Sequence, residues 1–201
     1  MLKIEINRQN LLNILQLESR GANQHAELPI LSSILIKTDQ DKSSVKLTST
    51  NLNQAILSEV KANIISSGTI AVPARITLEF ISSLNEELVT LEEGKNLKLK
   101  IYTKNHQSTI YLLNPEEYPE IPQVSEEYKT EVESTAFKDA LSAVSIAISK
   151  DDSRPILGGV LTYTTAEDEL CLVATDGHRL AEKTISIKST KKPFESTIIP
   201  S

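Results

Sequence analysis

The stretch LPILSSIL at residues 28–35 returns as RPILGGVL at residues 154–161, and this repeat decides how the chain is organised. The offset is 126 positions (154 − 28), and it extends upstream. There, KIEI at 3–6 corresponds to KTEV at 129–132, and each is followed by an apolar helical pattern. A repeat of this length predicts tandem domains of one fold rather than a solenoid of small units.

Three segments have the apolar spacing of amphipathic helices. The first begins after Asn7, a favourable N-cap, the second follows Pro73, a favoured first-turn residue, and the third follows Ser134. The residues expected on the three buried faces are Leu11, Ile14 and Leu15; Ile76, Phe80, Ile81 and Leu84; and Phe137, Ala140, Leu141, Val144 and Ile148. Each stripe covers about a third of its helix, so each helix buries one face and exposes the other.

Between the helices the pattern is typical of antiparallel strands with one exposed face. The clearest alternation is LKLKI at 97–101, and the segments 45–47, 89–91 and 109–112 behave similarly. The first 112 residues therefore follow the order strand, helix, three strands, twice over, with the second half beginning near Thr69.

Prolines interleaved with glutamates between residues 114 and 127 predict an extended connector and a domain boundary near Ser125. We expect a complete first domain at 1–125 and a second domain at 126–201 that starts in the same order. Pro200 is the counterpart of Pro73, so the second domain is expected to lack its second half. On this interpretation the chain is a fragment.

Composition describes an ordinary globular protein of 201 residues, with 39% apolar residues and a formal charge of −6. No apolar run approaches the ~18 residues of a membrane span, and no targeting pattern precedes the first strand, so we expect a cytoplasmic protein with no membrane partner. The single cysteine, Cys171, lies in an apolar run and is expected to be a small core residue. The acidic charge argues against a broad basic face for nucleic acid, but not against one local strip.

The segment VATDGHRLA at 173–181 places Gly177, His178 and Arg179 in a turn between strands, whereas its first-domain copy keeps Thr50 but lacks these three residues. This difference predicts a specialised site on a common frame. Three other interpretations remain: Asp176 and His178 only hold the turn, they serve a hydrolase or transferase, or the chain is a sequence-specific DNA-binding protein. A single Asp-x-His pair is at most half a metal site, and no glycine-rich phosphate loop is present, so neither a metal nor a cofactor is expected.

The chain resembles the bacterial sliding-clamp family, the beta subunits of DNA polymerase III. The resemblance rests on ATDGHRLA at 174–181, LPIL at 28–31, VPAR at 72–75 and YLLNPEEYP at 111–119, and it extends over the whole chain. It implies an α+β DNA-clamp fold in which each domain has two strand-helix-three-strand halves, with helices on the inner face of a ring and antiparallel sheets outside. The family's third domain is absent from this sequence.

The resemblance also implies a function. The family member is a processivity factor and a non-catalytic accessory subunit of DNA-directed DNA polymerase. It forms a ring-shaped homodimer around duplex DNA regardless of sequence, and its partners include the DNA polymerase III alpha subunit and the clamp loader, which bind through short peptide motifs. A net charge of −6 is compatible with this role, because topology rather than tight phosphate binding retains the ring. A fragment is not expected to close a ring.

Two sets of residues follow from the resemblance by position. The residues implied in peptide binding are Arg154, Leu157, Thr175, Gly177, His178, Arg179 and Leu180. The residues implied to face DNA are Arg8, Arg20, His25, Arg75, Lys138 and Lys150. His25 stands where relatives often have arginine, and Asp151 adds an acid beside Lys150. Because a third domain supplies the rest of the peptide pocket, we expect this chain alone to bind peptides weakly.

Overall fold

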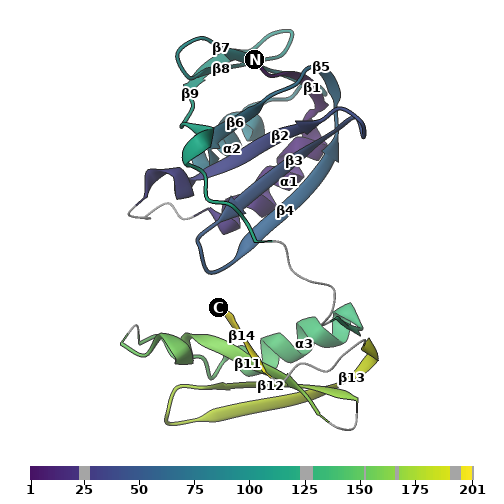
Figure 1. The fold of residues 1–201 in the computed structure, drawn as a ribbon, viewed down its shortest axis with the longest axis vertical. Helices are drawn as coiled ribbons and strands as arrows, with labels where there is room; N and C mark the ends of the chain where they lie inside the picture. Colours follow the sequence, from purple (N-terminus) through teal and green to yellow (C-terminus); the bar gives the residue numbers. More distant parts are fainter. Residues whose placement is uncertain (23–27, 123–128, 152, 166–167, 191–195, 201) are drawn as a thin grey trace. The chain divides into compact units, whose positions relative to one another are not determined.

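The computed structural model describes residues 1–22, 28–122, 129–151, 153–165, 168–190 and 196–200 (Figure 1). The chain divides into two compact units, Met1–Ile121 and Pro122–Ser201, called unit 1 and unit 2 below. Two sequence positions singled out above, His25 and the boundary residue Ser125, lie outside the described residues. No helix in the described part of the chain is long and apolar enough to cross a membrane.

Unit 1 contains the two strand-helix-three-strand halves expected from the sequence, with one strand more between them. Its elements are β1 (Lys3–Asn7), α1 (Arg8–Gly21), the 3-10 turn η1 (Pro29–Ser32), β2 (Ser33–Asp39), β3 (Ser44–Thr50), β4 (Ala55–Lys61), β5 (Asn63–Ser66), β6 (Thr69–Pro73), α2 (Ala74–Ser83), β7 (Leu88–Gly94), β8 (Lys98–Tyr102), β9 (Gln107–Tyr111) and the 3-10 turn η2 (Pro115–Glu117). The additional strand, β5, pairs with β1.

The two halves of unit 1 exchange their first strands. The sheets have the orders β5-β1-β7-β8-β9 and β4-β3-β2-β6, and all pairs are antiparallel. Strand β1 of the first half therefore pairs with β7 of the second, with Ile4 opposite Leu91, while β6 pairs with β2, with Val72 opposite Ile34. Each half thus depends on the other for its sheet.

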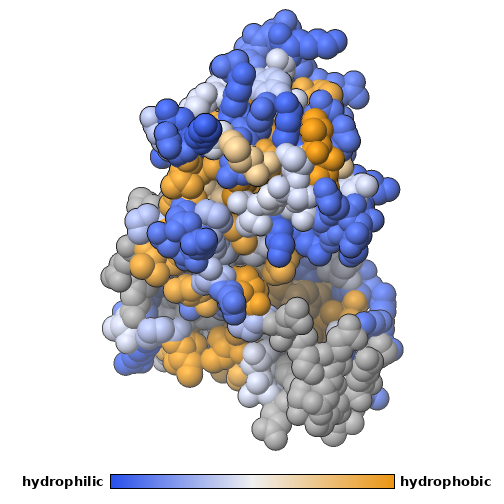
Figure 2. All heavy atoms as spheres, turned by 45° about the horizontal axis from the view of Figure 1, so that its top comes forward, coloured by the Kyte–Doolittle hydropathy of each residue, from blue (hydrophilic) through white to orange (hydrophobic). Residues whose placement is uncertain are grey.

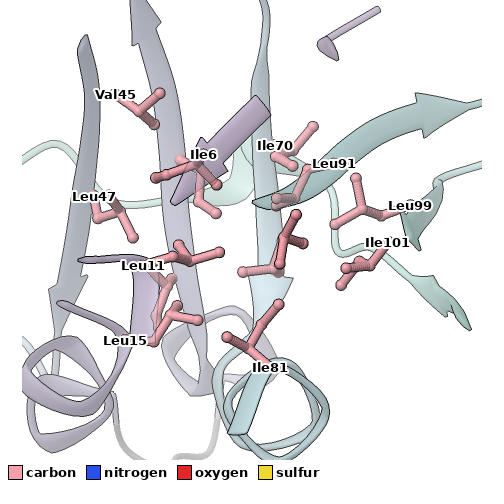
Figure 3. Close-up of a cluster of buried hydrophobic side chains, with 14 of the residues drawn as sticks. Ile6, Leu11, Leu15, Val45, Leu47, Ile70, Ile81, Leu91, Leu99 and Ile101 are labelled. Atoms are coloured by element: carbon pink, nitrogen blue, oxygen red, sulfur yellow. The ribbon is translucent and has the colours of Figure 1, made fainter. Parts of the chain in front are cut away.

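One hydrophobic core joins both sheets to both helices. Figure 3 shows its side chains pointing into the space between the helices and the strands, among them Leu11 and Leu15 from α1, Ile81 from α2, Leu47 from β3 and Leu91 from β7. These residues have relative exposures of 2% or less. Outside the core, hydrophilic side chains separate apolar ones into small patches on the face that Figure 2 shows.

The helix starts confirm the predicted cap at Asn7 and lie within one residue of the other two predicted starts. Asn7 caps α1, and its side chain accepts a hydrogen bond from the backbone N of Asn10 at 3.1 Å. Pro73 is the N-cap of α2, one position before the first turn. Helix α3 begins at Ser134, and its cap is Glu133, whose carboxylate accepts from the backbone N of Ala136 at 2.7 Å.

Three details of the predicted pattern are wrong. Ile76 is 54% exposed, because the buried face of α2 follows Ala74, Thr77 and Ile81. Leu97 lies in the turn before β8 with a φ of 51°, so the alternation begins one residue later. Thr90 in β7 is buried between two buried apolar neighbours, because the centre of this strand has no exposed face.

Unit 2 repeats the first half of unit 1. Its elements are β10 (Thr130–Val132), α3 (Ser134–Ser145), the 3-10 turn η3 (Pro155–Gly158), β11 (Gly159–Thr164), β12 (Glu169–Thr175), β13 (Leu180–Thr190) and β14 (Thr197–Pro200). They form one sheet of order β10-β13-β12-β11-β14. Pro200 lies opposite Gly159 just as Pro73 lies opposite Ser33, so β14 occupies the place of β6.

Helix α3 is the only α-helix that the described residues of unit 2 form, whereas α1 and α2 pack on each other in unit 1. Its apolar face covers β11, β12 and β13 through Ala140 and Val144. Phe137 and Leu141, which correspond to the buried Leu11 and Leu15 of α1, are only partly buried. Cys171 is buried in β12, as predicted for a core residue.

The core of unit 1 contains one buried carboxyl group, that of Glu18. Its Oε2 accepts a hydrogen bond from Ser49 Oγ at 2.6 Å, and its Oε1 has no partner in the described part of the chain. Burial raises the pKa of Glu18, and the hydrogen bond from Ser49 opposes this effect. The equivalent positions of unit 2 hold Val144 and Ala174, which are both buried, so the same frame also accepts an apolar pair.

This comparison predicts the cost of disturbing Glu18. Ser49→Ala leaves a buried carboxyl without its donor and should lower the free energy of unfolding by about 1–3 kcal/mol. Glu18→Val combined with Ser49→Ala installs the unit 2 pair and should recover part of that loss. Urea denaturation followed by circular dichroism tests this order, and a double variant less stable than Ser49→Ala would contradict it.

The same group predicts a pH dependence. Because the folded pKa of Glu18 is raised, the folded state holds the proton more tightly, and this stabilisation is lost as pH rises through the folded pKa. Glu18→Gln should therefore gain stability relative to the native chain as pH rises from about 4.5 to 7. A difference between the two chains that stays constant over that range would refute the assignment.

Candidate functional site

The turn between β12 and β13 is held by two side chains. Thr175 Oγ1 donates to the carbonyl oxygen of Arg179 at 2.7 Å and accepts from the backbone N of Gly177 at 3.1 Å. The carboxylate of Asp176 accepts from the backbone N of His178 at 3.0 Å and of Arg179 at 2.9 Å, and also from Arg179 Nε at 2.9 Å. Gly177 has a φ of 88°, in the left-handed region that favours glycine.

Unit 1 builds the same turn from other residues. Thr50 Oγ1 donates to the carbonyl oxygen of Gln54 at 2.8 Å and accepts from Leu52 N at 3.0 Å, while Asn51 Oδ1 accepts from Asn53 N and Gln54 N. Leu52 takes the position of Gly177 with a φ of 72°. The threonine and the Asp or Asn are therefore structural, and the residues displayed by the turn are the variable part.

The geometry does not favour Asp176 and His178 as a catalytic pair. The hydrogen bonds from the backbone of Arg179 and His178, together with the Arg179 side chain, hold the pKa of Asp176 at about 2. Asp176 is bonded to the backbone of His178 and not to its ring, so it does not orient the imidazole as a base would require. The described residues contain no group of three or more His, Cys, Asp or Glu side chains that could hold a metal ion.

The residues implied in peptide binding line separate parts of the surface around this turn. Leu157 and Thr175 line one mostly apolar groove of about 230 Å³. Arg154 and His178 line a second groove, and Arg179 lines a third beside Ile146 and Ile148. A side chain at Gly177 would point toward Arg154, because its Cβ would lie 3.7 Å from Nη1. Leu180 is 64% exposed and lines none of these grooves.

The apolar groove has a floor that sequence reasoning missed. Leu161 lies opposite Val173 on one side and opposite Ile198 on the other, so the three side chains form a row across β12, β11 and β14. Ile156 of η3 lines the same groove. Strand alternation places Leu161 and Val173 on one face of the sheet, but only the register brings them together.

Several basic residues implied to face DNA already have partners. Arg8 donates from Nε to the carbonyl oxygen of Ile81 at 3.3 Å and from Nη2 to that of Ser82 at 3.1 Å, so it caps the C-terminus of α2. Arg75 forms an ion pair with Glu79 at 2.9 Å on the same helix. Arg20 in the last turn of α1, Lys138 on α3 and Lys150 are exposed to solvent.

Both units match models of one protein family. Residues 2–122 match the DNA polymerase III beta subunit, N-terminal domain, and residues 131–201 match the DNA polymerase III beta subunit, central domain. Among curated proteins, the beta sliding clamp of Synechococcus elongatus is 30% identical over 197 residues, covering 96% of this chain and 52% of the relative. The beta sliding clamp of Staphylococcus aureus is 26% identical over 208 residues, covering 100% of this chain and 54% of the relative.

Solved structures have the same fold. The DNA polymerase III beta chain of Streptococcus pneumoniae is 25% identical with a TM-score of 0.90, and the match covers 100% of this chain and 54% of that one. The DNA polymerase sliding clamp of Bacillus subtilis gives a TM-score of 0.91 at 24% identity, over 99% of this chain and 54% of that one. The chain thus spans about half the length of the relatives it matches.

The turn itself generates a prediction. Asp176→Asn supplies the acceptor that Asn51 supplies in unit 1 and should preserve the turn, whereas Asp176→Ala should lower the melting temperature and shift the amide resonances of His178 and Arg179. Because the pKa of Asp176 lies below its ordinary 3.8, its contribution is present above about pH 3.8 and is lost as pH falls toward 2. Thermal unfolding and amide NMR spectra test both points, and an Asp176→Ala variant that matches the native chain in both measurements would show that the carboxylate does not hold the turn.

Proposed function

The chain belongs to the DNA polymerase III beta-subunit family, and on that premise we propose that it is part of a sliding clamp, the processivity factor of a bacterial replicative polymerase. The observation that carries the proposal is the match of two domain models, in family order, to the two units of the chain. In this role the protein surrounds duplex DNA as a ring-shaped homodimer and works in the cytoplasm as a non-catalytic accessory subunit.

We propose further that unit 1 is a complete clamp domain and that unit 2 is the first half of another. The internal comparison supports this: β14 occupies the place that β6 has in unit 1, while the described residues of unit 2 form no helix that packs on α3 as α2 packs on α1. A second half of the domain would supply that helix. A third domain would complete the peptide pocket and the closing surface of the ring.

The charges of the helices suit a clamp that slides. Every phosphate that a protein neutralises adds to a salt-dependent binding energy, so a ring with many free cations would be held in place. Here Arg8 and Arg75 have partners within the protein, and the exposed face of α1 carries amide side chains such as Gln9, Asn13 and Gln16. Retention on DNA would then come from ring closure rather than from ionic affinity.

The turn at 175–180 and the groove beside it are proposed as part of the site for partner peptides from the polymerase alpha subunit and the clamp loader. An apolar anchor of the peptide would lie on Leu157 and on the row of Leu161 and Val173. Arg154 and His178 would meet its polar groups. The equivalent turn of unit 1 has the same hydrogen bonds but displays no such residues. This difference between the two turns favours a role in peptide recognition for the turn of unit 2.

Peptide binding can be tested on this chain with a fluorescein-labelled peptide that contains glutamine, leucine and phenylalanine. We expect weak binding, because part of the pocket is outside this chain, and a low-micromolar dissociation constant would contradict that. Gly177→Leu should remove the remaining binding, since the new side chain points toward Arg154. Leu52 shows that the turn accepts leucine, and Leu52→Gly is the matched control that should leave binding unchanged.

The ring is tested with a longer protein in which this chain is followed by the completed second domain and a third. After loading by a clamp loader, that protein should stay on nicked circular DNA during gel filtration and be released when the circle is linearised. The present chain should be retained on neither. Equal retention on linear and circular DNA would indicate ionic binding and refute the topological role.

A further inference from the structure

A short segment of unit 1 lies over the face of its sheet that is turned away from the core. After β9 the chain passes beside β6 and forms η2 (Figure 1). Residues 113–118 of this segment are called the strap below. Leu113 and Tyr118 at its two ends pack against apolar side chains of η1, β2 and β6, and Tyr118 is only 8% exposed. The side chains that they cover are Ile30, Leu31, Leu35 and Ala71.

Hydrogen bonds join the strap to the sheet at its two ends. The backbone N of Leu113 donates to the carbonyl oxygen of Ala71 at 3.0 Å, and Tyr118 Oη donates to that of Thr48 at 2.9 Å. Between these ends the strap bonds to itself, for example from Tyr118 N to the carbonyl oxygen of Pro115 at 3.2 Å. Burial raises the pKa of Tyr118 to about 12, so its hydroxyl stays a donor at neutral pH. The strap is therefore a self-contained turn that presents two apolar side chains and one polar tip.

Unit 2 repeats the surface that the strap covers in unit 1. The strand register aligns three residues of each unit in a row across the sheet, with Leu35 or Leu161 in the middle. The rows are Thr48, Leu35 and Ala71 in unit 1, and Val173, Leu161 and Ile198 in unit 2. The repeated 3-10 turns η1 and η3 add Ile30 to the first surface and Ile156 to the second.

The exposure of these residues differs between the units. Ile30 is 5% and Ala71 is 0% exposed, whereas Ile156 is 69% and Ile198 is 39% exposed. In unit 2 the row is the floor of the open apolar groove of about 230 Å³, and in unit 1 the side chains of the strap occupy the same place. The described residues of unit 2 include no counterpart of the strap. Unit 1 therefore has a groove of the same construction that its own chain fills.

We propose that the strap is a built-in ligand that closes a second groove on unit 1, and that this groove binds a free phenol once the ring of Tyr118 is removed. The apolar side chains of Ile30, Leu31 and Leu35 suit a flat ring, and the carbonyl oxygen of Thr48 accepts a hydrogen bond from a hydroxyl. A phenol combines both features. While the strap is docked, only unit 2 has its copy of the groove open, among the residues that the structure describes. A tyrosine-bearing segment of another molecule must displace the strap to enter unit 1.

The test removes the ring and supplies it again as p-cresol. In Tyr118→Ala, p-cresol should shift the amide resonances of Ile30 and Leu31, and at about ten times its dissociation constant it should raise the melting temperature by about 5 °C. Toluene, which lacks the hydroxyl, should bind about three- to tenfold more weakly, because the carbonyl oxygen of Thr48 is then left without its donor. Tyr111→Ala is the matched control, since Tyr111 is 70% exposed on β9 and its removal should create no p-cresol site.

A second measurement uses the native chain and does not depend on the folding of Tyr118→Ala. If the strap opens without the sheet, the amide of Leu113 should exchange its hydrogen about tenfold or more faster than the amides of the β2–β6 ladder. Exchange at the rate of that ladder would show that the strap is part of the core and would overturn the proposal. A folded Tyr118→Ala chain whose Ile30 and Leu31 resonances do not respond to p-cresol would overturn it as well. Both measurements report on unit 1, so neither result changes the peptide site proposed for unit 2.

Discussion

The exchange of first strands between the halves of unit 1 is the constraint on which the rest of this structure depends. Strand β1 completes the sheet of the second half and β6 completes that of the first, so the core between α1 and α2 can form only when both halves are present. The pairing is non-local, and its register fixes which side chains reach the core. In unit 2, β14 pairs with β11 as β6 pairs with β2, so the described residues there repeat the sheet of the first half.

The shared turn shows how a repeated frame allows one copy to change. In both units a threonine and an Asp or Asn side chain satisfy the backbone groups of the turn. The side chains at the tip of the turn are not needed for these hydrogen bonds, so their identity can vary. Gly177 and Leu52 have nearly the same backbone conformation but display very different surfaces. The residues that hold the turn thus differ from those that it displays at its tip, so the displayed residues can vary without loss of the turn.

Local signals in the sequence predicted the helices well, because a cap such as Asn7 and an apolar stripe are sufficient to define where a helix begins and which face it buries. The apolar spacing places Ile76 on the wrong face, because Ala74 and Thr77 are buried in α2 beside Ile81 although neither is a large apolar residue. The strand exchange, and the row of Leu161, Val173 and Ile198, could not be predicted, since both depend on register between distant segments. The site residues came from the resemblance to a family, and the structure adds which of them share a groove.

Counting basic residues overstates the charge that this protein can offer to a ligand. Arg8 is directed to the carbonyl groups that end α2, Arg75 to Glu79, and Arg179 to Asp176, so three of the candidate residues are held by the protein itself. Lys150 and Arg154 lack such partners in the described residues and lie in one groove. Because an exposed ion pair is worth only about 0–1 kcal/mol, pairing lowers the availability of Arg75 and Arg179 only slightly, whereas Arg8 has its guanidinium directed to two backbone carbonyl groups.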